Sequence, residues 1–142
     1  MRRRTRGQAG VTLIEMMVVV TIIALFAALV LPKMIGQADK ARKTAARTQI
    51  NNYVTALGSY KLDTGVFPTT EQGLSALRLR PENVNNWQGP YLTKDVENDP
   101  WGHPYVYRYP GEHGDEPDLL SYGADGQPGG DGINADIVSW KN

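Results

Sequence analysis

The sequence predicts an α+β protein in which one long N-terminal helix packs on a small antiparallel β-sheet. Two features predict the helix: an apolar run from Val11 to Leu31, and a stripe of apolar residues at helical spacing that continues to Tyr60. A third feature predicts the sheet, because the last third of the chain contains short segments rich in β-branched and aromatic residues. A helix followed by separate strands is typical of an α+β unit.

The first part of the chain is a basic leader followed by an apolar helix. Residues 1–10 contain four arginines and no acidic residue, and the 21-residue apolar run that follows has Glu15 as its only ionisable side chain. Such a run suits a single crossing of the bilayer core, and basic residues ahead of a span keep that end in the cytoplasm. We therefore predict a leader at 1–10, a transmembrane and assembly helix at 11–35 in the inner membrane, and a periplasmic globular domain at 36–142.

Three interpretations of the apolar run differ in what happens to it. A plain membrane anchor tolerates Glu15 without using it. A secretory signal peptide has an apolar core of about 7–15 residues and an Ala-x-Ala cleavage site, whereas this run is longer and no such site follows it. A prepilin-type leader is cut on the cytoplasmic side, after Gly10, so that the run stays on the mature chain. The third interpretation is preferred because it alone explains both Gly10 and Glu15.

At these residues the chain resembles the superfamily of type IV pilins and type II secretion pseudopilins. The superfamily pattern is Gly, a hydrophobic residue, Thr, Leu, any residue and Glu before an apolar helix, and it matches residues 10–15. One departure is Val11, where Phe is common. The resemblance implies that a prepilin peptidase cuts after Gly10 and that the new terminus, Val11, is N-methylated.

Glu15 needs a partner, because an unpaired carboxylate within a bilayer costs several kcal/mol. Cleavage after Gly10 creates an α-amino group on Val11, about one helical turn from Glu15. Pairing with an amine removes most of the cost of burying the charge. The amine could belong to the same chain or to a neighbouring copy, and the residues leave both pairings open. The resemblance favours the neighbour, in which case the ion pair fixes the axial register between copies.

Helical spacing and breaking residues define the elements beyond the span. The helix is expected to run from Thr12 to Leu62. A kink is expected at Pro32 and a stop at Gly65, followed by a short helix at residues 70–77 in which Leu74 and Leu77 face inward. Strands are expected at 105–109, 119–122 and 135–138. The residues expected on the core-facing stripe of the long helix are Ile50, Tyr53, Val54, Leu57 and Tyr60.

The basic residues that follow the span along the helix are Lys33, Lys40, Arg42, Lys43 and Arg47. We expect them to form a solvated helix face. The alternative is a contact between this face and an acidic patch on a neighbouring subunit.

The mature chain is acidic and contains no cysteine. The leader holds four of the 15 basic residues and none of the 15 acidic ones, so the remainder carries a formal charge of −4. Such a chain is not expected to take nucleic acid as its main partner. Without disulfides, another device must hold the loops of a small extracytoplasmic domain. No Ser, His and Asp set stands out as a catalytic triad, and no zinc-ligand spacing surrounds His103 or His113, so we expect both histidines at the surface and no enzymatic activity. Trp101 is expected to pack a turn over the sheet, with a sugar-binding aromatic as the alternative.

A glycine-rich segment at residues 122–136 is the candidate binding site. It contains five glycines together with Asp125, Asp131 and Asp136. Calcium takes carboxylate and carbonyl oxygens as ligands, and glycines let a backbone turn tightly enough to present its carbonyls. The spacing is not that of an EF-hand, because no Glu closes the loop. We interpret the segment as a calcium-binding loop, with a solvated acidic loop as the alternative.

Several segments outside the span narrow the resemblance. They are Phe67–Leu74, Gly89–Leu92, Asp99–Tyr105, and Ser121–Gly126 with Gly129–Gly132 and Ala135–Ile137. At these segments the chain is similar to the major pseudopilins of type II secretion systems, the G subunits. The resemblance implies that calcium is bound by the side chains of Asp125 and Asp131 and by carbonyls at Tyr122 and Gly130. Asp136 is a weaker candidate ligand.

The same resemblance implies a structural function and a set of partners. Copies of the chain would polymerise into a helical pseudopilus that drives folded periplasmic proteins across the outer membrane. Minor pseudopilins, the inner-membrane secretion platform and a prepilin peptidase would be the other partners. The alternatives are a type IV pilin-like fibre subunit for adhesion, motility or DNA uptake, and a membrane-tethered calcium-binding or sugar-binding module that never polymerises.

Overall fold

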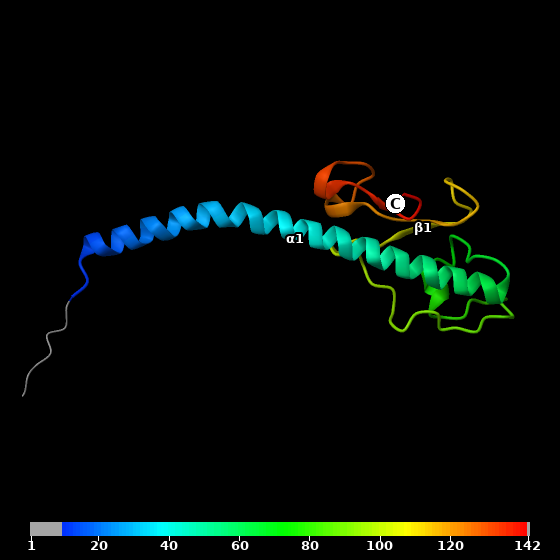
Figure 1. Cartoon of the computed structure of the whole chain (residues 1–142). Coiled ribbons are helices and arrows are strands. Elements are labelled where there is room, and N and C mark those ends of the chain that lie inside the picture. The colour runs from blue at the N-terminus through cyan, green and yellow to red at the C-terminus, as the bar shows by residue number, and fades with distance from the viewer. Residues whose placement is uncertain (1–9, 142) are drawn as a thin grey trace, which may run out of the picture. The chain divides into compact units, whose positions relative to one another are not determined.

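The computed structural model describes residues 10–141, apart from the side chains of residues 31–35, and it divides into two compact units, 1–38 and 39–142. The helix α1 (Leu13–Thr64) begins in the first unit and continues into the second (Figure 1). The other elements belong to the second unit: η1 (Leu74–Leu77), β1 (Val106–Arg108), β2 (Asp118–Ser121), η2 (Gly123–Asp125), η3 (Gly132–Asn134) and β3 (Ile137–Val138). The predicted α+β fold is confirmed.

The helix α1 begins and ends close to the predicted residues. It starts after Thr12, whose hydroxyl oxygen accepts a hydrogen bond of 3.3 Å from the backbone N–H of Glu15. It ends at Thr64, and the next residue, Gly65, has a φ of 83° and donates its N–H to the carbonyl of Lys61 at 2.8 Å. A glycine in this left-handed conformation is a common helix stop. The kink predicted at Pro32 lies among the residues whose side chains are not described.

The first part of α1 has no covering within its own chain. The window Leu13–Val30 has a mean hydropathy of 2.8 and is 0% buried. It is therefore long and apolar enough to cross a membrane. Helices that are apolar on every face are stable only inside a larger protein or in lipid.

The second part of α1 packs against the rest of the second unit through the predicted stripe. Ile50, Tyr53, Leu57 and Tyr60 are all buried, and Val54 is half-buried beside them. The residues from other segments that join this core are Phe67, Leu74, Ala76, Leu77, Tyr107, Leu119 and Ile137. Burying one large apolar side chain contributes about 1.5–3 kcal/mol, so this cluster holds the unit on the helix.

The sheet has three antiparallel strands in the order β1-β2-β3. Tyr107 pairs with Leu119, and Leu120 pairs with Val138. β1 and β3 are shorter than the segments predicted at 105–109 and 135–138, whereas β2 has the predicted length but begins one residue before the predicted 119–122. The shortening of β1 follows from the prolines at 104 and 110, which flank it and have no N–H to continue a ladder.

The helix predicted at residues 70–77 is reduced to the single 3-10 turn η1. Gly73 precedes it with φ 57° and ψ −163°, which is not a helical conformation. The backbone therefore turns at 70–73 before η1 begins. Leu74 and Leu77 are both buried, as the sequence predicted.

Hydrogen bonds replace disulfides in holding the long segment that follows η1. The indole N–H of Trp87 donates to the carbonyl of Ala76 at 2.8 Å, and the hydroxyl of Tyr91 donates to a carboxylate oxygen of Asp63 at 2.8 Å. The rings of Trp87 and Tyr91 pack edge to face, with centroids 5.7 Å apart. These contacts tie the irregular chain between η1 and β1 back onto the end of α1 and the η1 turn.

Candidate functional site

The residues predicted to take part in processing and assembly lie at the exposed start of α1. A Cβ added at Gly10 would meet no atom within 4 Å, and Val11 is 61% exposed. Glu15 is exposed in the first turn of the helix, and within the described residues no ion pair of its carboxylate is found. The site is therefore accessible from outside the chain, as a protease or a neighbouring copy would require.

Thr12 and Glu15 also form a helix-capping arrangement that the sequence analysis missed. The Thr12 hydroxyl binds the N–H of Glu15, and the Thr12 carbonyl accepts the N–H of Met16 at 3.2 Å. The signal was available, since Thr followed three residues later by Glu is the pattern of a capping box. Both residues thus serve the start of the helix in addition to any role between copies.

The glycine-rich segment folds back on itself through positions that only glycine can occupy. Gly123 has a φ of 69°, and a Cβ there would lie 3.0 Å from the carbonyl oxygens of Asn134 and Ala135. Gly130 has a φ of 83°, and a Cβ there would lie 2.8 Å from the same oxygen of Asn134. The turns η2 and η3 are thereby brought together, and Tyr122, Gly130 and residues 134–136 lie in one folded loop.

The three aspartates of the loop have different surroundings. Asp125 is exposed and accepts the N–H of Gln127 at 3.1 Å, and Asp131 is exposed just before η3. Asp136 is half-buried and accepts the N–H of Gly129 at 2.9 Å through Oδ2. Its other oxygen, Oδ1, is buried and has no hydrogen-bond partner. Across residues 10–141, no three carboxylate or imidazole side chains converge as metal ligands, so any cation in this loop depends on backbone carbonyls as well.

A buried polar network anchors the start of the loop. Asp99 is 4% exposed, and its Oδ1 accepts the N–H groups of Trp101 and His103 at 3.0 and 2.8 Å. Its Oδ2 accepts the hydroxyl of Ser121 at 2.5 Å, and the Ser121 oxygen accepts the N–H of Gly123 at 3.2 Å. One carboxylate therefore links the 99–103 turn to the end of β2 and the first residue of η2.

The ring of His103 completes this anchor. Its Nδ1 lies 3.2 Å from the carbonyl oxygen of Gly123, and a Cβ at Gly126 would lie 3.1 Å from the ring. The sequence predicted His103 as a surface residue, which is incomplete, because its ring is only partly exposed and contacts the loop. Trp101 packs against the core, as predicted for a residue that holds a turn over the sheet.

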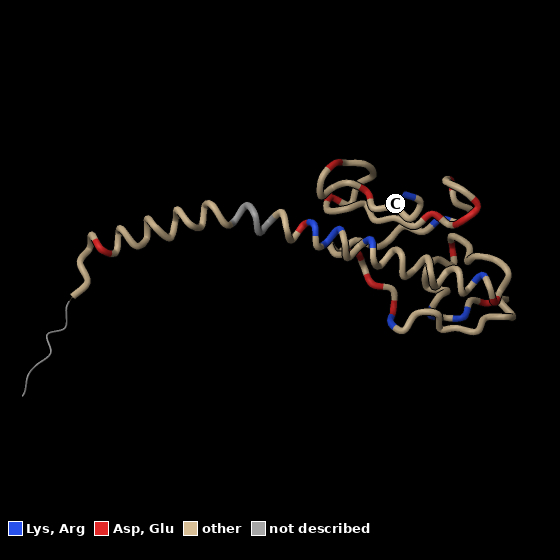
Figure 2. Tube along the Cα trace, in the orientation of Figure 1, with Lys and Arg blue, Asp and Glu red and all other residues tan. Residues whose placement is uncertain are grey.

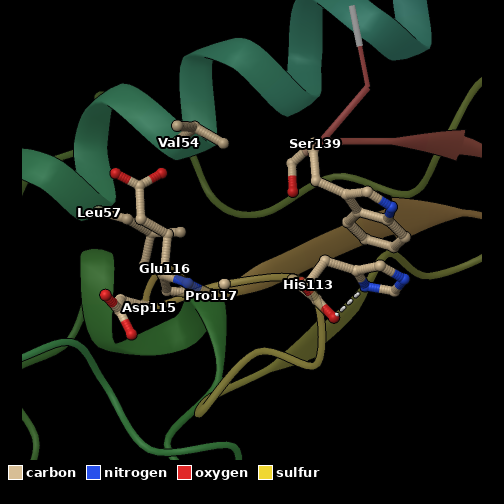
Figure 3. A pocket seen from close by; sticks show the side chains of 10 residues that line it. Val54, Leu57, His113, Asp115, Glu116, Pro117 and Ser139 are labelled. Carbon is tan, nitrogen blue, oxygen red and sulfur yellow. Dashed lines mark hydrogen bonds and ion pairs between the residues drawn. The ribbon is translucent and has the colours of Figure 1, made fainter.

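Two hollows flank the second part of α1. An open groove of about 670 Å³ lies between residues of α1, among them Lys43 and Arg47, and residues 135–137. A smaller cavity of about 250 Å³ lies between Val54 and Leu57 of α1 and the segment 113–118, with Ser139 and Trp140 at its edge (Figure 3). Ser139, His113 and Asp118 all line the smaller cavity, but among the described residues no hydrogen bond joins the Ser139 hydroxyl to the His113 ring.

His113 sits at the edge of the smaller cavity and joins two segments. Its ring stacks on Trp140 with centroids 3.9 Å apart, and its Nδ1 lies 2.8 Å from Oδ2 of Asp118 (Figure 3). Burial alone would raise the pKa of the Asp118 carboxyl, but the hydrogen bonds from His113 and from the N–H of Glu112 outweigh it. The pKa of Asp118 is therefore held below its usual value, and the carboxylate fastens the β1–β2 connection.

Two family models match the chain. The model described as type II secretion system protein G matches residues 33–140, and the prokaryotic N-terminal methylation motif matches residues 5–31. Together the two matches cover both the span with its cleavage motif and nearly all of the folded unit.

Proteins with similar sequences and folds carry the same description. A Vibrio cholerae protein named Type II secretion system core protein G is 45% identical over 142 residues, covering 98% of this chain and 96% of that protein. One of the same name from Pseudomonas aeruginosa is 45% identical over 140 residues, covering 96% of this chain and 98% of that protein. The crystal structure of the major pseudopilin from the type 2 secretion system of enterohaemorrhagic Escherichia coli is 34% identical with a TM-score of 0.64, covering 77% of this chain and 95% of that one.

These matches confirm the resemblance on which the sequence interpretation rested. They extend over the motif at residues 10–15 and over the folded unit that contains the core, the sheet and the glycine-rich loop. The chain belongs to the type II secretion system protein G family.

Proposed function

We propose that this chain is a structural subunit of the pseudopilus of a type II secretion system, and that the pseudopilus drives export of folded periplasmic proteins across the outer membrane. The observation that carries the proposal is the helix Leu13–Val30, which is apolar on all sides and 0% buried within its own chain. In a member of the protein G family, such a helix is suited to pack against copies of itself once it leaves the membrane. Minor pseudopilins and the inner-membrane secretion platform are the further partners we propose.

The cleavage and methylation steps are proposed for Gly10 and Val11. The methylation motif at residues 5–31 and the exposure of Val11 support them. Gly10→Leu should leave an uncut precursor in the membrane, because the peptidase needs a small residue at the cut. Mass spectrometry of the mature chain decides the point, and a mature terminus at any residue other than Val11 contradicts it.

We propose that the Glu15 carboxylate pairs with the α-amino group of a neighbouring copy. Its exposure at the start of an otherwise apolar helix supports a partner outside the chain. Glu15→Ala should insert and be cleaved normally but should fail to form fibres, which electron microscopy of sheared material can measure. Fibres as abundant as those of the parent chain would show that the carboxylate does not set the register.

The proposed topology places residues 1–10 in the cytoplasm and the 39–142 unit in the periplasm before assembly. The four arginines ahead of the span support this orientation. Protease added to spheroplasts should digest the folded unit of the precursor, and protection of that unit would reverse the proposed topology.

We propose calcium as the ion that holds the glycine-rich loop. The support is chemical: Asp136 Oδ1 is a buried carboxylate oxygen without a partner, and such orphaned atoms often mark an unfilled ligand position. The carbonyls of Tyr122 and Gly130 would supply further hard oxygen ligands, and the exposed carboxylates of Asp125 and Asp131, which do not converge with Asp136 in the described residues, would turn toward the ion on binding. Bound there, calcium would remove the repulsion between carboxylates and lower the entropy of the loop.

Calcium binding can be tested by thermal unfolding of the mature chain in detergent micelles. A ligand that binds only the folded state adds about 2.7 kcal/mol of stability at a concentration 100 times its dissociation constant. The melting temperature should therefore rise with calcium and fall with a chelator. Asp125→Ala should abolish the response, while Asp115→Ala, which removes an exposed carboxylate outside the loop, should keep it. Equal melting temperatures in calcium and chelator for the parent chain would falsify the assignment.

Two alternatives differ from the pseudopilus in observable ways. A fibre for adhesion, motility or DNA uptake would extend beyond the cell at normal expression, whereas a pseudopilus subunit should form surface fibres only when overproduced. A tethered calcium-binding or sugar-binding module has no use for Glu15 and would form no fibres at all. The packing of Trp101 against the core also leaves this ring poorly placed to stack on a sugar.

A further inference from the structure

One face of α1 in the second unit carries basic side chains that have no acidic partner within the described residues. The residues of this basic face are Lys40, Lys43 and Arg47, spaced so that they share one side of the helix, with Thr44, Thr48 and Asn51 beside them. Figure 2 shows the basic segments near the beginning of the helical part of this unit. Arg42, which pairs with Asp39 at 4.0 Å, lies on a different side of the helix.

An acidic loop lies farther along the same unit. Residues 112–116 connect β1 to β2 and carry Glu112, Asp115 and Glu116, all exposed. Glu112 lies 3.4 Å from Arg108, while neither Asp115 nor Glu116 has an ion-pair partner in the described part of the chain. Figure 2 shows this loop as an acidic tip away from the basic part of the helix.

The two charged regions are offset along the axis of α1. Asp115 and Glu116 line the cavity formed with Val54 and Leu57, whereas the basic face is centred on Lys43. At 1.5 Å per residue, the 11 to 14 helical residues between these levels correspond to an offset of about 17–21 Å. The regions therefore cannot neutralise each other within one copy.

We propose that the basic face of one copy binds the acidic loop of a second copy. The second copy lies parallel to the first and is shifted along the helix axis toward the N-terminal end of α1, so that its acidic loop is level with the basic face of the first. Membrane insertion gives every copy the same orientation, so neighbouring helices are parallel. A shift of one copy along the axis then places its acidic loop beside the basic face of the next. The contact is head-to-tail, the kind that builds open helical filaments rather than closed dimers. It also explains why an otherwise acidic mature chain keeps three basic residues together on one helix face.

The chemistry of the groove favours a second copy over a lipid surface as its occupant. The groove beside the basic face is also lined by Asp136 and by the hydroxyl and amide side chains of Thr44, Thr48 and Asn51. These side chains can form hydrogen bonds with the backbone and the carboxylates of a partner, and an exposed acidic loop supplies both kinds of group. An anionic headgroup brings acceptors alone, whereas a peptide loop also brings backbone N–H groups, which the hydroxyl oxygens of Thr44 and Thr48 can accept. This inference rests on the proposed self-assembly and adds the surfaces that make it.

The absence of cysteine from the chain makes a crosslinking test specific. Arg47→Cys combined with Glu116→Cys in the full chain should give a ladder of disulfide-linked multimers when fibres are oxidised. The two positions cannot close within one copy, because a disulfide needs Cα atoms about 4.4–6.8 Å apart and the axial offset alone exceeds this. The matched control is Ala45→Cys with Glu116→Cys, since Ala45 is exposed at the same level of α1 on the side opposite the basic face and should give no ladder. Equal ladders in both pairs, or none in the first, overturn the proposal.

Charge reversal supplies a second test that does not depend on introduced thiols. Lys43→Glu with Arg47→Glu should abolish fibres, and so should Asp115→Lys with Glu116→Lys. All four changes together should restore fibres, because the unlike charges are only exchanged. A lipid-binding role for the basic face predicts no restoration, and that result overturns the proposal. If the unaltered chain itself forms no fibres, the proposed self-assembly fails, whereas parent fibres without the specific crosslink show that this contact alone is wrong.

Discussion

The two parts of α1 are one continuous helix in two opposite environments. Leu25, in the apolar part, is 64% exposed within the chain, whereas Leu57, in the packed part, is 2% exposed. The apolar part has hydrophobic residues on all sides, and the packed part has them in a single stripe. A one-sided stripe is satisfied by the chain's own domain, but an all-sided one needs lipid or other proteins. The difference shows which part of the helix folds the protein and which part must be covered by lipid or by other proteins.

Carboxylates in the folded unit and in the apolar part of α1 differ in burial in the same way. Asp99 is buried and accepts three hydrogen bonds from its own chain. Glu15 is exposed at the start of the apolar part, and its backbone, not its carboxylate, is the group bound by Thr12. A buried, satisfied carboxylate stabilises the fold, while an exposed one on an apolar helix is available for a partner. Substitutions in the two parts should therefore separate stability from assembly.

The largest effect is expected for a leucine in the packed part. Leu57→Ala should lower the free energy of unfolding of the 39–142 unit by about 2–5 kcal/mol, through lost burial and the cavity left behind. Leu25→Ala should leave that free energy unchanged, because Leu25 contacts none of the core. Denaturant unfolding of the mature chain in micelles, followed by tyrosine and tryptophan fluorescence, measures both.

A conservative variant sharpens this comparison. Leu57→Met keeps most of the volume and should cost less than about 1.5 kcal/mol. A loss for Leu25→Ala as large as that for Leu57→Ala would mean that the apolar part also contributes to the fold of the domain.

The second prediction compares the two carboxylates. Asp99→Ala should lower the free energy of unfolding by about 2–3 kcal/mol, because the N–H groups of Trp101 and His103 and the Ser121 hydroxyl lose a buried charged acceptor. Glu15→Ala should leave domain unfolding unchanged and affect only fibre formation. If Asp99→Ala unfolds at the parent's denaturant midpoint, the network does not anchor the loop.

The bounds of α1 could be predicted from the sequence because they depend on local signals. The spacing of the stripe and the glycine at position 65 placed its end within two residues of the observed Thr64. The helix predicted at 70–77 failed because Gly73 takes a conformation that the helix-like composition around it does not reveal. The sequence predicts β1 and β3 to be longer than they are, and for β1 the reason is that the flanking prolines end a segment whose β-branched and aromatic content favours a strand.

The anchor of the glycine-rich loop could not have been predicted by the same means. Asp99 and Ser121 are 22 residues apart in the chain, and no periodicity links them. Their contact depends on the turn at 99–103 meeting the end of β2, which is a property of the folded unit. The candidate ligands of the loop, by contrast, lie in one short segment, so they could be identified from its composition alone.

The third prediction concerns the acid stability of the packed part. Hydrogen bonds depress the pKa of Asp118, so its carboxylate stabilises the fold above the unfolded pKa of about 3.9 and loses that contribution as the pH falls through the lower folded value. Asp118→Asn should cost about 1–2 kcal/mol at neutral pH. The difference between parent and variant should shrink below about pH 3.9. Unfolding curves at several pH values measure it, and a difference that grows on acidification would reverse the assigned sign.

The smallest effect is expected at the start of the apolar part. The Thr12 hydroxyl accepts the N–H of Glu15, so Thr12→Ala removes a helix cap worth about 0.5–1 kcal/mol. The Glu15 amide should then exchange roughly two- to fivefold faster in the mature chain in micelles, while the amides of the packed part exchange as before. Thr12→Ser keeps a hydroxyl in place and should restore slow exchange. Unchanged exchange in Thr12→Ala would mean that lipid, rather than the helix's own cap, orders the first turn, and the apolar part would then depend on its surroundings from its first residue.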